Sequence, residues 1–229
     1  MNDEAPHLTD RRLRTPRAAA IAGILFALLL GTSLILIRIS IPTDPADGGR
    51  WLEERANTVV LALSLMPFAG IAFLWFIGVV RDRIGSHEDR FFSSVFFGSG
   101  LLYLAMMFVA AALAGSLLST YAIMPDRLVE SGIYAFGRAI MWQISNIYAI
   151  RMAGVFMISL GTIWIRTHTM PRWLVFVTYG LALVLAVSIS YSLWVTLIFP
   201  GWVLLISIYI LVSNLRSKGA EDGLAITLE

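Results

Sequence analysis

The sequence predicts an all-α membrane protein, a bundle of six transmembrane helices. Hydrophobic residues make up 58% of the 229 residues and charged residues only 14%, whereas about a quarter of the residues in soluble domains are charged. The mean hydropathy is +0.79. Uncharged runs recur along the chain, and each is long enough for a crossing, which takes ~20 residues.

The first predicted span follows a polar, arginine-containing segment, residues 1–17. The run Ala18–Ile37 carries no charge. Because it is longer than the apolar region of a signal peptide and no small-residue cleavage site follows it, we expect a membrane helix. Small side chains recur every fourth residue and form a ridge that we expect to pack within the chain, with a homodimer seam as the alternative. The ridge consists of Ala19, Gly23, Ala27 and Gly31.

The next two spans are separated from their neighbours by loops rich in turn-forming or charged residues. We expect Trp51 at the headgroup level and a bend at Pro67, within the second span, Val59–Val80. The uncharged stretch Phe91–Pro125 exceeds one crossing, so the third helix is expected to tilt or to continue past the membrane surface.

The fourth helix is expected to begin at the surface near Leu128 and to cross from about Asn146 to Ile165. The stretch Trp173–Leu215 has no charge and would measure about 65 Å as one helix, roughly twice the hydrocarbon core. It is therefore expected to form a hairpin. The predicted turn consists of Ser188, Ser190, Tyr191 and Ser192.

These spans divide the chain into a basic N-terminal segment (1–17), a transmembrane domain (18–213) and a polar tail (214–229) that we expect to lack regular structure. The segments on one side of the predicted spans carry most of the flanking arginines. The positive-inside rule therefore places both termini in the cytoplasm. The six predicted spans cover about residues 18–40, 58–80, 92–118, 139–165, 173–189 and 193–212.

Four segments resemble a group of small integral membrane proteins of actinobacteria whose function is unknown. The resemblance implies a six-span protein of the bacterial plasma membrane and assigns no catalytic residue. An arginine-dominated set of basic residues, with Lys218 as the one lysine, also favours a GC-rich bacterial genome. The segments are PFAGIAFLWFIGVVRDRIG (67–85), EDRFFSSVFFGSGLLYLAM (88–106), YAFGRAIMWQISNIYAIRMAGVFMIS (134–159) and MPRWL (170–174).

The sequence contains no pattern typical of an enzyme, a metal centre or a cofactor site. The chain has no cysteine, which excludes disulfides and thiolate ligands. The histidines His7, His87 and His168 all fall in predicted loops, so neither a serine nucleophile nor a metal within the membrane would have the imidazole it needs. Basic residues stand singly at span ends rather than in a stripe, so we expect no nucleic-acid partner.

The candidate site is a set of polar residues on the outer half of the spans: Arg38, Arg138, Asn146 and Arg151. Arg151 lies about 7–8 Å into the fourth crossing. Its side chain could extend to the headgroups or pair with a carboxylate outside the spans. Alternatively, the three arginines line a cavity for an anion, for which a lipid phosphate or carboxylate suits the guanidinium geometry. The carboxylates available for pairing are Glu53, Glu54, Asp126 and Glu130.

For the function, the sequence favours a non-enzymatic structural or accessory role in the membrane. Its partners would be the lipid bilayer and either other membrane proteins or further copies of the chain. The alternative is a lipid- or anion-binding, transporter-like protein that uses the outer-half arginines.

Overall fold

The computed structural model describes residues 15–42, 49–84, 90–187 and 193–226. Within these ranges every regular element is a helix, which confirms the all-α class. Five of the described helices are long and apolar enough to cross a membrane, and a sixth apolar helix is shorter. The five are Ala18–Ser40, Ala56–Arg81, Phe91–Ile123, Ile133–Thr167 and Trp194–Leu215, and the shorter one is Arg172–Val187.

The first half of the chain forms three long helices, α1 (Thr15–Ser40), α3 (Ala56–Ile84) and α4 (Arg90–Ile123). Pro67 lies inside α3 without ending it. Helix α4 is a single helix of 34 residues and rises about 51 Å, well beyond a hydrocarbon core of about 30 Å. The third helix is thus longer than one crossing, as its uncharged stretch predicts.

Two short helices lie between the long ones, α2 (Trp51–Glu54) and α5 (Pro125–Glu130). After α5 the chain forms one helical rod with a π-helical turn in its middle. The rod consists of α6 (Ile133–Gln143), the π turn η2 (Ile144–Tyr148) and α7 (Ala149–Thr167).

The last part of the chain contains α8 (Arg172–Val187), the short 3₁₀ helix η3 (Leu193–Leu197) and α9 (Ile198–Ile226). Pro200 lies in the first turn of α9, where a proline removes no intrahelical hydrogen bond. The predicted hairpin turn at residues 188–192 lies outside the described residues. The tail, predicted to lack regular structure, instead continues α9 as helix to Ile226.

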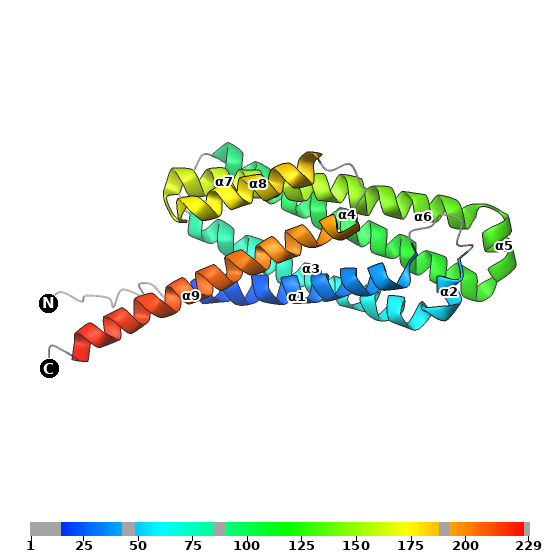
Figure 1. The fold of residues 1–229 in the computed structure, drawn as a ribbon, viewed down its shortest axis with the longest axis horizontal. Coiled ribbons are helices and arrows are strands. Elements are labelled where there is room, and N and C mark those ends of the chain that lie inside the picture. The colour runs from blue at the N-terminus through cyan, green and yellow to red at the C-terminus, as the bar shows by residue number, and fades with distance from the viewer. Residues whose placement is uncertain (1–14, 43–48, 85–89, 188–192, 227–229) are drawn as a thin grey trace, which may run out of the picture.

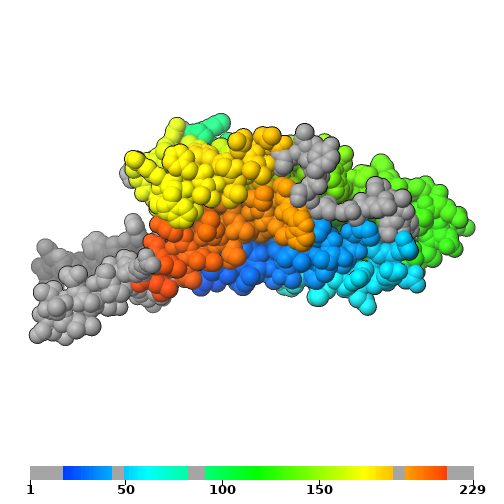
Figure 2. Space-filling model, in the orientation of Figure 1, coloured from blue at the N-terminus to red at the C-terminus, as the bar shows by residue number. Residues whose placement is uncertain are grey.

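The helices form an elongated bundle (Figure 1). The start of α1 and the end of α9 lie at one end, and α2 and α5 lie at the other. Helix α1 packs against α3 and α9, while α4 packs against α6 and α7, and α7 against α8. Figure 2 shows α8, α9 and α1 as adjacent bands on one face of the molecule.

Aromatic side chains occupy the centre of the bundle. The Phe73 ring lies 4.4 Å from the Phe26 ring and 5.5 Å from the Phe156 ring, centroid to centroid. Tyr103 and Phe199 complete this cluster. Its members come from α1, α3, α4, α7 and α9, so aromatic contacts hold five helices together at one level.

A second, smaller core lies at the end of the bundle that carries α2 and α5. Trp51 is only 2% exposed there, and its Nε1 donates a hydrogen bond to the Tyr134 hydroxyl at 2.8 Å. The indole thus faces protein, and the headgroup level expected for Trp51 stays a prediction. The core consists of Ile41, Trp51, Leu52, Val59, Leu117, Leu128 and Tyr134.

Candidate functional site

A pocket of about 110 Å³ lies between α1, α3, α4, the α6–η2 rod and η3. It brings together three of the four residues predicted from the sequence, Arg38, Arg138 and Asn146. Its remaining polar residues are Ser145 and Thr196, and none of the described lining residues is acidic. The apolar walls consist of Leu34, Ile37, Ile41, Pro42, Met66, Met107, Ala110, Ala111, Ala114, Met141 and Trp142.

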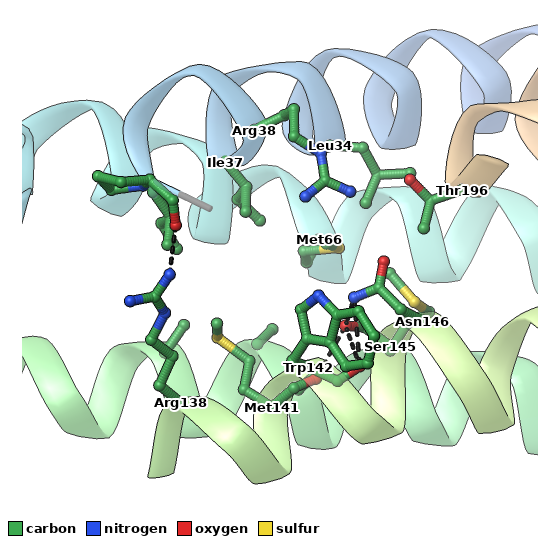
Figure 3. A pocket seen from close by; sticks show the side chains of 16 residues that line it. Leu34, Ile37, Arg38, Met66, Arg138, Met141, Trp142, Ser145, Asn146 and Thr196 are labelled. Carbon is green, nitrogen blue, oxygen red and sulfur yellow. Dashed lines mark hydrogen bonds between the residues drawn. The ribbon is translucent and has the colours of Figure 1, made fainter. Parts of the chain in front are cut away.

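Arg38 reaches the pocket from α1. It lies in the last turn of that helix, where the carbonyl ends favour a positive charge, and its side chain is half-buried. In Figure 3 the guanidinium extends from α1 toward Trp142 and Asn146 on the opposite helix. Arg38 therefore places its positive charge inside the space between the two helices.

Arg138 enters from the opposite side, on α6. Its Nη2 donates a hydrogen bond to the carbonyl oxygen of Pro42, which follows α1 in the chain. Helix α1 packs on α3 and α9, whereas α6 packs on α4. The contact from Arg138 to Pro42 therefore links two halves of the bundle across the pocket.

The π turn η2 carries Ser145 and Asn146 to the pocket. Ser145 Oγ donates to the Met141 carbonyl at 2.8 Å, and Asn146 Nδ2 donates to Ser145 Oγ at 2.9 Å and to the Trp142 carbonyl at 3.2 Å. Through these bonds the two side chains supply donors to backbone carbonyls. The carbonyls lie where the π turn shifts the hydrogen-bond register of the α-helix. Single π turns inside α-helices are frequent at functional sites.

Trp142 contributes a further donor. Its ring lines the pocket, and Nε1 has no hydrogen-bond partner among the described residues. In Figure 3 the indole nitrogen points toward the side from which Arg38 enters. Trp142 therefore faces the pocket, and the nearby Tyr134 is buried.

Arg151 is not part of the pocket. Its side chain is exposed, and Nη1 donates to the Ile147 carbonyl one turn earlier at 3.0 Å. Ile150 and Ala153 continue the inward face of the rod and are buried, so Arg151, between them, points outward. No carboxylate pairs with it in the part of the chain that the structure describes.

The pocket has small residues on its α4 wall. Ala110, Ala111 and Ala114 line it, whereas the neighbouring Ala112 is exposed. The sequence gives no signal that Met66, Met107 or Thr196 would join the arginines at one site. Their contribution depends on how α3, α4 and η3 are placed around the arginines.

A second cavity of about 10 Å³ adjoins the pocket and shares Leu34, Met107, Ser145 and Thr196 with it. It ends at Tyr103 and Phe199, members of the aromatic cluster. A space of this size holds about one water molecule. The pocket is therefore closed on its inner side by the aromatic core.

Groups of three or more side chains suited to hold a metal ion are not found among the described residues. Comparison of this chain with protein-family models, with curated proteins and with solved structures finds no match.

Proposed function

We propose that this protein is a six-span protein of the bacterial plasma membrane that binds an anionic group in the pocket between Arg38 and Arg138. It would act as a lipid- or anion-binding, transporter-like protein. The observation that carries the proposal is the convergence of two arginines from separate helices on one cavity. The structural or accessory role favoured by the sequence stays a prediction, since nothing among the described residues identifies a protein partner.

The path of the chain supports six crossings. The start of α1 and the end of α9 lie at the same end of the bundle, which requires an even number of crossings. Helix α8 is the shortest of the six at 16 residues and rises about 24 Å. A helix shorter than the hydrocarbon core crosses by thinning the bilayer locally.

The distribution of charge supports cytoplasmic termini. Arg81 and Arg166 lie at the end of the bundle where α1 begins, and each guanidinium lies over a phenylalanine ring of α4, at 4.9 and 4.8 Å. The opposite end carries the acidic residues of α2 and α5, together with Arg50, Arg55 and Arg127. Since the segments on the side where α1 begins hold most of the flanking arginines of the sequence, the positive-inside rule favours a cytoplasmic position for that end and an outer position for the pocket.

The donors around the pocket favour an anion. A guanidinium binds phosphate or carboxylate oxygens through two parallel hydrogen bonds, and the Trp142 indole adds an N–H donor. Such bonds are stronger where protein walls exclude water. The apolar lining supplies that exclusion on the sides formed by α3 and α4.

The test compares Arg38→Gln with Arg151→Gln, the same change at an arginine outside the pocket. Both variants are purified in detergent and studied by native mass spectrometry for bound lipid and by calorimetric titration with ethyl phosphate and with butyrate. Loss of a charge-assisted hydrogen bond costs about 1.5–3 kcal/mol, so Arg38→Gln should weaken anion binding roughly tenfold or more. Arg151→Gln should leave it unchanged.

Thermal unfolding of both variants checks that the bundle is intact. A wild-type protein that binds neither anion and carries no anionic lipid would exclude the proposed function. Equal binding by wild type and folded Arg38→Gln would also contradict it, because the pocket would then not be the site.

A further inference from the structure

We infer that the ligand of this pocket is an anionic amphiphile, a phosphate or carboxylate head joined to an alkyl chain of which only the first few methylenes are enclosed. This inference rests on the proposed function and names the class of ligand. It follows from the unequal chemistry of the pocket walls and from the size of the pocket.

The charged side of the pocket is formed by Arg38 and Arg138, with Asn146 and the Trp142 indole beside them. The lining residues of α3 and α4 are all apolar and include Met66 and Met107, and α1 and α6 add Leu34, Ile37 and Met141. A fully hydrophilic anion would leave this apolar wall facing water. An alkyl group joined to the anion would cover it, with a gain of about fourfold in affinity for each methylene buried.

Methionine side chains suit such a wall. Their three rotatable bonds and polarisable sulfur let them adapt to chains of different position and length. Next to Met107 on α4 the lining residues are Ala110, Ala111 and Ala114, which leave room for the chain where larger residues would fill the pocket. The pocket is thus expected to tolerate chains of different shape, while the gain in affinity depends on how many methylenes are enclosed.

The size of the pocket limits how much of the chain it encloses. A cavity of about 150 Å³ accommodates a benzene ring, and this one has about 110 Å³. The inner side is closed by Tyr103 and Phe199, where the adjoining space has room for about one water. A long chain must therefore extend beyond the pocket, and its outer methylenes add nothing to the recognition.

The experiment is a calorimetric titration of the protein in nanodiscs with alkyl phosphates from methyl to octyl, and with the matching carboxylates. Empty nanodiscs provide the correction for partitioning into lipid. We expect affinity to rise about fourfold per carbon over the first few carbons and then to level off. The two series distinguish a phosphate head from a carboxylate head.

The matched variants are Ala111→Leu, in the α4 wall, and Ala112→Leu, the same change at the next, exposed residue of the helix. Ala111→Leu should remove most of the gain from chain length, at least tenfold for hexyl phosphate, while methyl phosphate binds as in wild type. Ala112→Leu should behave as wild type throughout.

Equal affinity for methyl and hexyl phosphate would overturn the inference that the ligand is an amphiphile. It would not contradict the anion site of the proposed function. Binding that rises with chain length without levelling off would also overturn it, since it would indicate partitioning rather than a closed pocket. Absence of binding by every member of both series would end both proposals. If Ala111→Leu does not fold, the dependence of the wild-type affinity on alkyl chain length is by itself the test of the inference.

Discussion

Trp51 and Tyr134 are joined by a hydrogen bond buried in the small core at the end of the bundle that carries α2 and α5, with Trp51 Nε1 donating to the Tyr134 hydroxyl at 2.8 Å. The two residues are 2% and 4% exposed. This bond fixes α2, which follows the loop after α1, against the start of α6. This core adjoins the pocket, because Ile41 belongs to both and α6 also carries Arg138.

Tyr134→Phe should destabilise this small core. The change leaves the buried Trp51 N–H without its acceptor, which costs about 1–3 kcal/mol. Thermal unfolding in detergent should show a lower Tm, and hydrogen exchange should rise in α2. Tyr148→Phe is the control, because Tyr148 is exposed and has no hydrogen bond through its hydroxyl among the described residues. Equal Tm values for the two variants would show that the Trp51 bond contributes nothing.

Gly23→Leu should disrupt the packing of α1. A Cβ atom at Gly23 would lie 2.0 Å from Ser207 Oγ on α9 and 2.9 Å from Phe76 Cδ2 on α3, so a leucine cannot fit unless both helices move. Overpacking of this kind costs about 1–3 kcal/mol or more. The matched control is Gly31→Leu, because a Cβ at Gly31 meets no atom within 4 Å.

Differential scanning fluorimetry of the two glycine variants in the same detergent provides the comparison. The prediction requires a Tm clearly lower for Gly23→Leu than for Gly31→Leu. The opposite order would mean that the ridge of small residues on α1 faces lipid at Gly23 and packs against another surface at Gly31.

Thr178→Val should weaken the contact between α8 and α9. Thr178 Oγ1 accepts a hydrogen bond from Trp202 Nε1 at 2.9 Å and donates to the Leu174 carbonyl at 2.8 Å. Valine has nearly the same shape but no acceptor, so the indole N–H would be buried unpaired, at a cost of about 1–2 kcal/mol. Urea or heat unfolding measures the loss.

A double-mutant cycle with Trp202→Phe isolates this bond. Phenylalanine has no donor, so Thr178→Val should cost clearly less in that background than in the wild type. Additive effects of the two changes would show that the hydrogen bond does not stabilise the helix pair.

Single cysteines should report the orientation of the bundle, because the natural sequence has none. Asp126→Cys, on exposed α5, should react with an impermeant maleimide added to intact cells. Thr169→Cys, in the exposed connection between α7 and α8, should react only after the cells are permeabilised. The reverse pattern would place the arginine pocket in the cytoplasmic half and the termini outside.

The sequence by itself determined where the apolar helices lie. Hydropathy over about 20 residues depends only on local composition, so the long helices of the structure overlap the predicted spans. The length of α4 follows from its uncharged stretch in the same way. The helical continuation of α9 into the polar tail was not predicted, because hydropathy marks where a helix leaves the membrane and not where it ends.

Only the tertiary structure decided which polar residues meet. Arg38, Arg138 and Arg151 look alike in sequence, yet the two former line one pocket and Arg151 lies on the exterior. The difference depends on the direction each side chain takes around its helix. For Arg38 this follows from the packing of α1 on α3 and α9, and for Arg138 and Arg151 from the π turn at residues 144–148 and the packing of α6 and α7 on α4. In a membrane such packing is driven by close van der Waals contact of small residues rather than by burial of apolar surface. The hydropathy of the sequence therefore does not indicate how the helices pack, and the pocket could be found only from the assembled bundle.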